Sequence, residues 1–281
     1  MSATTTTRTL LPERRLTPAG ERILSVRPSL QDTTRQTFAM ARRALVKMRR
    51  NPEQFFDVTL QPILFTAMFA YVFGGGLAGS VQAYLPFMIP GILAQTALTA
   101  SMATGTQMRE DMDNGVFDRF KSLPIARIAP LAGPMMADLL RYGIAATITI
   151  LVGLTMGYRP EGGVLGVAAG WLLTVFAGWS LSWIFAWLGT VARSAQTVQG
   201  IGMMIMFPLT FLSNAYADPK TMPDWLNAFV KINPVSHVVT AVRDLMNDGN
   251  VTGEVGWAVL SCALVVAVWA PLAVRSYSRK I

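Results

Sequence analysis

Apolar runs of about 20 residues recur along this chain, and they constrain its fold more than any other feature. A helix needs about 20 consecutive apolar residues to cross the hydrocarbon core of a bilayer. The runs cover residues 57–77, 84–107, 136–158, 164–189, 197–216 and 255–274. We therefore predict an all-α integral membrane protein with six transmembrane helices.

Composition supports this class and excludes others. Only 14% of the residues are charged, whereas a soluble domain carries about 25%. The net charge of +8 comes from basic residues that flank the apolar runs, which is typical of topology signals and anionic lipid contact. We therefore expect membrane lipids as partners and no nucleic acid. Cys262 is the only cysteine, so neither an internal disulfide nor a cysteine-rich metal site can form.

The distribution of basic residues predicts the direction of the spans. If both termini are cytoplasmic, 19 of the 24 lysines and arginines lie on the inner side. The outer side then holds four basic residues, Arg159, Lys220, Lys231 and Arg243. The positive-inside rule favours this orientation.

The segment before the first run divides into two parts. Residues 1–30 lack apolar periodicity and are expected to form a disordered cytoplasmic tail. Residues 31–51 place Phe38, Ala41, Leu45 and Met48 at helical spacing among basic residues. This pattern predicts an interfacial amphipathic helix on the inner leaflet, with ordinary topology charges as the alternative. Residues 31–281 are then one transmembrane domain.

Two polar pairs border the predicted hydrocarbon region. Asp57 lies near Gln61 at the start of the first run, and Asp138 shares a helix face with Arg141 at the start of the third. Ionisable groups inside a membrane are functional candidates. Both pairs, however, fall at the inner boundary beside headgroups and water, so we interpret them as ion pairs or interface anchors rather than a proton relay.

Sequence motifs argue against an enzyme and against an ATP site. The chain has neither a G-x-x-x-x-G-K-[ST] phosphate loop nor an H-E-x-x-H metal motif. His237 is the only histidine, and we interpret it as structural or solvated. We therefore predict a transport subunit that binds no metal and no cofactor of its own.

The segment from 108 to 123, "MREDMDNGVFDRFKSL", differs from the apolar runs around it. Its apolar residues fall on one helical stripe, namely Met108, Met112, Val116, Phe117, Phe120 and Leu123. We predict a cytoplasmic amphipathic helix that ends before Pro124. A membrane-surface loop is the alternative, but the four acids of this segment suit an anionic leaflet poorly. An apolar projection ringed by charges is typical of a helix that binds a protein groove.

These residues also resemble a known family. The run "GVFDRFKSLPIARIAPLAG", residues 115–133, is similar to the cytoplasmic signature of ABC-2 type permeases, especially the daunorubicin and doxorubicin resistance branch. The run "NPVSHVVTAVR", residues 233–243, resembles the segment before the last span of the same family. The resemblance covers nearly the whole chain.

The resemblance implies a division of labour. A separate ABC ATPase subunit would bind ATP and Mg, and this chain would provide the pathway in a bacterial-type plasma membrane. A second permease copy or a sister permease would complete the pathway. The coupling helix between spans two and three would contact the ATPase through Glu110, Asp111, Asp113, Gly115, Phe117, Asp118, Arg119 and Phe120.

The substrate follows from the apolar walls. Walls of Met, Phe, Leu and Gly cannot offset the desolvation of a highly charged solute, and 16 methionines suit varied shapes. We expect a hydrophobic small molecule or a lipid, and the resemblance indicates anthracycline-like drugs or lipids. Candidate pathway residues are Phe65, Phe69, Met203, Met204, Met206 and Phe207.

The outer loop from 217 to 253 is expected to form short re-entrant helices that act as an external gate. Its candidate gate residues are Trp225, Leu226, Phe229, Asn233, Pro234 and Arg243.

Two transport alternatives stay open. A proton-coupled secondary transporter would use Asp57 and Asp138 and would need no ATPase. An ABC exporter of polysaccharide would need a continuous channel lined by aromatic residues.

Overall fold

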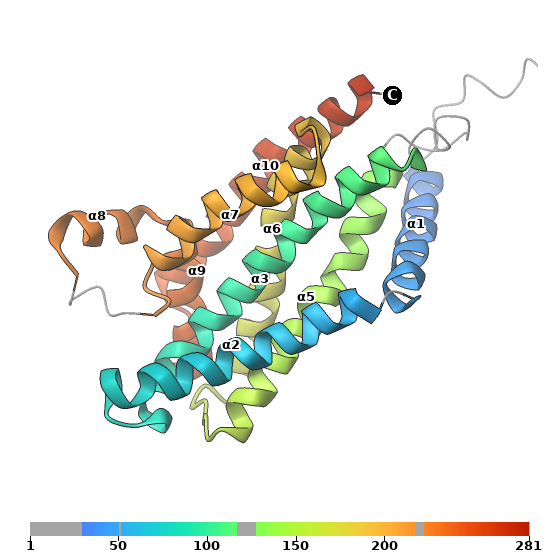
Figure 1. The fold of residues 1–281 in the computed structure, drawn as a ribbon. Helices are drawn as coiled ribbons and strands as arrows, with labels where there is room; N and C mark the ends of the chain where they lie inside the picture. Colours follow the sequence, from blue (N-terminus) through green and yellow to red (C-terminus); the bar gives the residue numbers. More distant parts are fainter. Residues whose placement is uncertain (1–29, 51, 117–127, 217–221, 281) are drawn as a thin grey trace, which may run out of the picture.

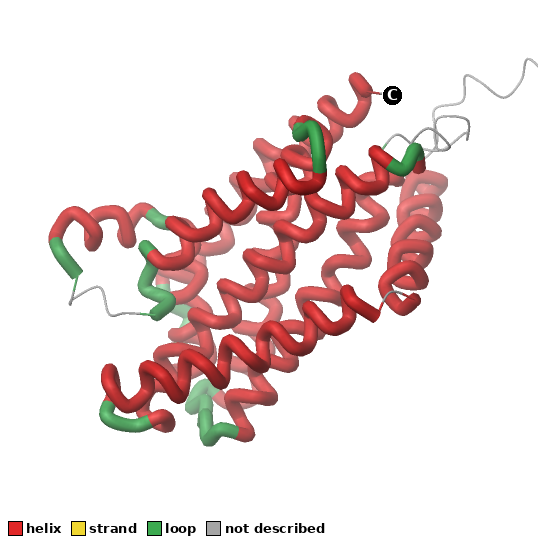
Figure 2. The backbone as a smooth tube through the Cα atoms, viewed as in Figure 1, coloured by secondary structure: helices red, strands yellow, loops and turns green. Residues whose placement is uncertain are grey.

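A computed structural model of the chain describes residues 30–50, 52–116, 128–216 and 222–280, and every regular element in these ranges is a helix (Figure 2). The helices are α1 (Leu30–Arg50), α2 (Pro52–Ala78), α3 (Val81–Asp113), α5 (Ala129–Thr155), α6 (Gly163–Val191), α7 (Ala195–Phe211), α8 (Asp224–Ile232), α9 (Pro234–Arg243), the π-helix η2 (Asp244–Asp248) and α10 (Gly253–Lys280). The all-α prediction is confirmed over the described part of the chain.

Among the described helices, α3, α5, α6 and α10 combine the length and the hydropathy of membrane spans. The first and fifth predicted spans correspond to α2, with 27 residues, and α7, with 17 residues. The described residues therefore contain four candidate membrane spans, and the total of six stays a prediction.

The helices form a tilted bundle with two distinct ends (Figure 1). At one end, which we call the α1 end, lie α1, the turn after α3 and the C-terminal part of α10. At the other, the α8 end, lie α8 and the turn between α2 and α3. Helix α3 is central, since it packs against α2, α5, α6, α7 and α9. Its buried side chains, including Leu85, Met88, Ile89, Ile92 and Leu93, form the middle of the core.

Helix α3 extends beyond the end of the second predicted span, 84–107. The hydrophobic run ends at residue 107, but the helix continues to Asp113. It stops at Asn114 and Gly115, and Gly115 has φ +65°, a left-handed conformation that favours glycine at helix ends. Within the described residues, the predicted helix over 108–123 is therefore interrupted at Asn114 and Gly115, and its first six residues are the last turns of α3.

Backbones of α3 and α6 touch near the α1 end. A Cβ atom at Gly105 would overlap the carbonyl oxygen of Phe185, and one at Gly189 would overlap the carbonyl oxygen of Gly105. Small residues at such a crossing allow close van der Waals packing between membrane helices. The two helices are thus held at fixed separation in this region.

Candidate functional site

The end of α3 that holds the predicted coupling residues is joined to α1. The ammonium group of Lys47 in α1 donates to Asp111 Oδ1 at 2.8 Å. Lys47 is half exposed, whereas Asp111 is more buried. One basic residue of α1 therefore contacts one acidic residue in the last turns of α3, a contact within the chain that sequence analysis did not predict.

Arg109 joins the same end of α3 to the end of α6. Its guanidinium donates to the carbonyl oxygen of Ala192 at 2.9 Å and pairs with Asp113 one turn further along α3. Glu110 is exposed beside them. Three predicted coupling acids, Glu110, Asp111 and Asp113, thus lie on one short exposed segment next to α1 and α6.

The remaining predicted coupling residues fall in or beside the next segment. Gly115 forms the turn that ends α3. Phe117, Asp118, Arg119 and Phe120 lie outside the residues that the structure describes. Their contact with an ATPase stays a prediction.

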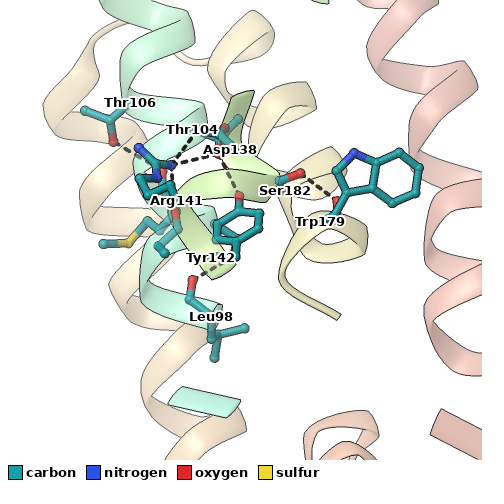
Figure 3. A network of polar contacts seen from close by, with 11 residues as sticks. Leu98, Thr104, Thr106, Asp138, Arg141, Tyr142, Trp179 and Ser182 are labelled. Carbon is teal, nitrogen blue, oxygen red and sulfur yellow. Dashed lines mark hydrogen bonds and ion pairs between the residues drawn. The ribbon is translucent and has the colours of Figure 1, made fainter. Parts of the chain in front are cut away.

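A buried polar cluster lies between α3 and α5 (Figure 3). Arg141 pairs with Asp138 at 3.1 Å and donates to the carbonyl oxygen of Ala100 at 2.8 Å. The hydroxyl of Thr104 donates to Asp138 Oδ2 at 2.6 Å and lies 3.1 Å from the hydroxyl of Tyr142. Because each charged group has partners on both helices, the cluster fixes α3 against α5.

The expected ion pair is confirmed, but its expected place beside lipid headgroups is wrong. Asp138 and Arg141 are 7% and 4% exposed and face the interior of the protein. The reason is that α5 begins at Ala129, seven residues before the apolar run, so Asp138 lies in the third turn of the helix and Arg141 in the fourth. The side chain of Asp57, the other predicted acid, lies outside what the structure describes.

A small cavity connects this cluster to the surface at the α1 end. It has a volume of about 60 Å³, with Lys47 and Asp111 among its lining residues on one side and Asp138 and Arg141 on the other. Drug-binding pockets measure roughly 300–1,000 Å³, so this cavity holds only a few water molecules. It is a narrow, mainly apolar crevice between α1, α3 and α5, with a few charged groups at its walls, rather than a substrate site.

Aromatic rings join α2 to the end of α7. Phe65 stacks on Phe69 at 6.0 Å, and Phe69 stacks on Tyr216 at 4.5 Å between ring centroids. Tyr216 then contacts Phe211 at 5.7 Å, and Phe211 stacks on Phe207 at 5.1 Å. Three predicted pathway residues from two distant segments, Phe65, Phe69 and Phe207, are thus brought into one aromatic row.

The predicted pathway methionines separate onto two faces of α7. Met206 is buried, and the hydroxyl of Thr99 in α3 donates to its sulfur at 3.4 Å. Met203, Met204 and Phe207 are 41%, 74% and 53% exposed. The six predicted pathway residues therefore do not line one cavity within this chain, and α7 presents an uncovered apolar face.

Asn233, a predicted gate residue, joins α9 to α7. Its side-chain oxygen accepts from the backbone N–H of Val235, which caps α9 just before Pro234. Its side-chain nitrogen donates to the carbonyl oxygens of Leu209 at 2.8 Å and Leu212 at 3.1 Å. The start of α9 is therefore fixed to the last turn of α7.

Arg243, at the other end of α9, holds this helix against α3. Its guanidinium donates to the carbonyl oxygens of Phe87 and Asn214, both at 3.0 Å, and lies 4.2 Å from the centroid of the Phe87 ring. The predicted outer gate thus includes a helix that is packed into the core through Val238, Val239 and Val242.

Asn247 in η2 adds a second contact with α3. Because Pro90 lacks an N–H, the carbonyl oxygen of Pro86 has no helical donor, and Asn247 donates to it at 2.8 Å. Tyr158 in turn donates to Asn247 Oδ1 at 2.6 Å. Burial raises the pKa of Tyr158 above its ordinary value, so the hydroxyl stays protonated and remains a donor.

Helix α8 carries the other predicted gate residues and projects from the bundle (Figure 1). Trp225 and Phe229 are 70% and 40% exposed, and Leu226 is half-buried. The predicted gate set therefore divides into an exposed group on α8 and a buried group on α9.

Sequence reasoning missed Thr104, Tyr142, Asn247 and Tyr158. Tyr142 carried a usable signal, since it lies four residues after Asp138 on the same helix face. Thr104 and Asn247 act across the bundle, so no spacing along the chain indicates them.

Comparisons with known proteins place this chain among transport permeases. The profile of the ABC-2 type transporter family matches residues 35–247, a region that contains the α3–α5 polar cluster and α9. The chain is 40% identical over 267 residues to "Daunorubicin resistance ABC transporter permease protein DrrB1" of Streptomyces coeruleorubidus, which covers 95% of this chain and 93% of the relative.

Further relatives are more distant. The identity is 26% over 249 residues with "Doxorubicin resistance ABC transporter permease protein DrrB" of Mycobacterium tuberculosis, over 85% of this chain and 86% of the relative. It is 24% over 216 residues with "Putative transport permease ycf38" of Cyanophora paradoxa, over 75% of this chain and 73% of the relative. The similarity thus extends over most of each chain.

Proposed function

The chain belongs to the ABC-2 type transporter family, and from this premise we propose that it is the membrane-spanning permease subunit of an ATP-driven exporter of hydrophobic or amphipathic drugs. One observation carries the proposal. The chain shares 40% identity, over nearly the full length of both proteins, with a permease named for daunorubicin resistance. Anthracycline-like molecules are therefore the proposed substrates, with lipids as the second choice within the same class.

ATP and Mg are proposed to bind a separate ATPase subunit. The absence of a phosphate-loop motif from the sequence supports this division. The proposed contact with the ATPase is formed by Glu110, Asp111 and Asp113 at the end of α3 together with the segment around Phe117 and Phe120. The exposed position of Glu110 and the turn at Gly115 support this assignment.

Helix α3 is the proposed path of force through the membrane. Phe87 and Asp111 are 24 positions apart in this helix, which corresponds to roughly 36 Å along its axis. Its α1 end bears the Lys47 ion pair, and its α8 end bears the Arg243 contact. A displacement at one end of a rigid helix moves the other end by a similar amount. Closure of the ATPase would therefore move the part of α3 that contacts Arg243 of α9.

Two features keep α3, α5 and α6 together during such a movement. The backbone contact at Gly105 fixes α3 to α6, and the Asp138 cluster fixes α3 to α5. We propose that the three helices move as one body, while α8 and α9 form the external gate. Rigid-body rocking of helices about an interface is a common way to alternate access.

We further propose six spans, with α2 and α7 added to the four long apolar helices, and two permease copies for each exporter. The exposed apolar face of α7, with Met203, Met204 and Phe207, would face the second copy and line the pathway between them. Both termini are proposed to be cytoplasmic in a bacterial-type plasma membrane. The gathering of the basic helix α1 and the basic end of α10 at one end of the bundle supports this orientation (Figure 1).

Co-reconstitution with the cognate ATPase tests the proposal. Inside-out vesicles that hold both subunits should accumulate daunorubicin when ATP is added, and collapse of the proton gradient should leave this uptake unchanged. Vesicles with the chain alone should accumulate none. Uptake by the chain alone under an imposed proton gradient would refute the proposal in favour of a secondary transporter.

The coupling segment has its own test. Phe117→Ala with Phe120→Ala should abolish co-purification of the ATPase while the chain still inserts into the membrane. Trp225→Ala, which removes an exposed aromatic ring at the opposite end, is the matched control and should leave co-purification unchanged. Equal retention of the ATPase in all three proteins would disprove the assignment.

A further inference from the structure

A groove with a volume of about 420 Å³ lies between the C-terminal parts of α6 and α10. It has no part in the coupling segment, the polar cluster or the predicted gate. Its lining residues are Trp187, Val191, Leu272, Arg275, Ser276 and Arg279. The volume lies within the range of roughly 300–1,000 Å³ that is typical of small-molecule sites.

Two arginines form the charged side of this groove. Arg275 and Arg279 are four residues apart on α10, so their side chains share one helix face. Both are exposed, and within the described part of the chain neither makes a side-chain hydrogen bond or ion pair. Two neighbouring guanidinium groups without a carboxylate are suited to an anionic ligand that binds two donors at once.

The remaining lining of the groove is mainly apolar. Val191 and Leu272 are 48% and 38% exposed, and Trp187 packs against Trp269 with 4.9 Å between ring centroids. Tryptophan is enriched where a helix passes from hydrocarbon to headgroups. Leu272 lies one turn before Arg275, towards the apolar part of α10, where Leu264 and Val268 are also exposed.

We propose that this groove binds the phosphate headgroup of an anionic phospholipid, with an acyl chain along Val191 and Leu272. Arg275 and Arg279 would donate to the phosphate oxygens, and the hydroxyl of Ser276 supplies a further donor. The arginine pair disfavours a wholly apolar ligand. Burial of an acyl chain against Val191 and Leu272 would add binding energy that free phosphate cannot gain. A bound lipid would bridge α6 and α10 at the α1 end of the bundle.

Retention of phospholipid by the purified full-length chain tests the site. In native mass spectrometry, the detergent-solubilised chain should retain one phosphatidylglycerol more tightly than phosphatidylcholine. Arg275→Gln with Arg279→Gln should weaken this retention roughly 10-fold or more, as expected for two basic residues near an anionic lipid. Arg159→Gln with Lys231→Gln, two exposed basic residues that do not line this groove, removes the same charge and should leave it unchanged.

Three outcomes would overturn the proposal. Equal weakening by the two double variants would show a general charge effect rather than a site. Displacement of the lipid by millimolar inorganic phosphate would indicate an anion site without lipid specificity. A changed oligomeric state in the Arg275→Gln, Arg279→Gln variant, with lipid retention intact, would assign the groove to a protein interface.

Fluorescence in the unaltered chain gives a measurement that does not depend on the arginine variants. Brominated phosphatidylglycerol should quench part of the tryptophan emission more strongly than brominated phosphatidylcholine does. Trp187→Phe should remove that extra quenching, whereas Trp171→Phe, towards the other end of α6, should not. Equal quenching by the two lipids would contradict the site.

Discussion

Arg243 binds Phe87 twice, through a hydrogen bond of 3.0 Å to the backbone carbonyl oxygen and through the ring, whose centroid lies 4.2 Å from the guanidinium. The same side chain donates to the carbonyl oxygen of Asn214. One arginine therefore joins the C-terminal end of α9, the N-terminal part of α3 and the segment after α7. A movement of α3 along its axis would therefore displace α9 through this side chain.

Arg243→Lys should destabilise the protein although it keeps the charge. Lysine lacks the planar guanidinium that lies over the Phe87 ring, and its shorter side chain would have to move to reach both carbonyl oxygens, so we expect a loss of roughly 1–3 kcal/mol. Arg159→Lys is the control, because Arg159 also donates to two backbone carbonyl oxygens, but only within its own segment. Thermal unfolding in detergent measures both, and equal midpoints for the two variants would contradict the role of Arg243.

Gly105→Ala should separate α3 from α6. A methyl group there would overlap the carbonyl oxygen of Phe185, and overpacking of this kind costs roughly 1–3 kcal/mol. Gly200→Ala is the matched control, because a Cβ in that helical position meets nothing within 4 Å. The measurement is the unfolding midpoint of each variant. A Gly105→Ala protein as stable as Gly200→Ala would show that the two backbones are not in obligatory contact.

The sequence predicted the long helices well because apolar runs and membrane thickness together determine them. Their ends were predicted less well, since hydrogen bonds continue a helix beyond its apolar part. Helix α5 starts at Ala129 rather than near residue 136, and this shift moved Asp138 from an expected boundary into the interior. The helix break at Gly115 depends on a backbone conformation that the apolar stripe over 108–123 did not reveal.

The predicted site residues divide by whether their partners are near in sequence. The pair Asp138 and Arg141 was predicted because three residues of helix bring them together. The contacts of Lys47 with Asp111 and of Arg243 with Phe87 join residues 64 and 156 positions apart. Such contacts depend on how the helices pack, which one sequence does not determine.

The Asp138 pair gives a prediction about stability. Asp138→Asn leaves the buried Arg141 charge without its carboxylate, and breaking a buried pair costs roughly 3–5 kcal/mol. The double variant Asp138→Leu with Arg141→Met removes both charges and should be more stable than Asp138→Asn. Asp113→Asn, which breaks a more exposed pair with Arg109, should cost below about 1 kcal/mol.

Unfolding in denaturant ranks these three variants. If Asp138→Asn were as stable as Asp113→Asn, the cluster would not hold α3 against α5. The same variant also tests the proton-coupled alternative. ATP-driven uptake by folded Asp138→Asn, unaffected by collapse of the proton gradient, is expected from the proposed exporter, whereas a proton relay through this carboxylate requires complete loss of transport.

The ion pair between Lys47 and Asp111 gives the most direct test of coupling through α3. Because the pair is partly exposed, its contribution to stability is about 0–1 kcal/mol, so Lys47→Asp should leave the unfolding midpoint nearly unchanged. It should nevertheless lower ATP hydrolysis stimulated by the permease, because α1 and the last turns of α3 would repel each other beside the ATPase. Arg42→Asp, with the same charge reversal on an exposed site of α1, is the control.

The charge-exchanged chain, Lys47→Asp with Asp111→Lys, distinguishes two explanations of that loss. If the contact between α1 and α3 orients the coupling segment, the exchanged pair restores the attraction and most of the stimulated hydrolysis returns. If Asp111 instead contacts the ATPase itself, a lysine at that position repels the same partner surface and hydrolysis stays low. The measurement is ATP hydrolysis by the cognate ATPase in vesicles, as stimulated by the purified chain. Only recovery of this hydrolysis is consistent with a role of α1 in orienting the end of α3.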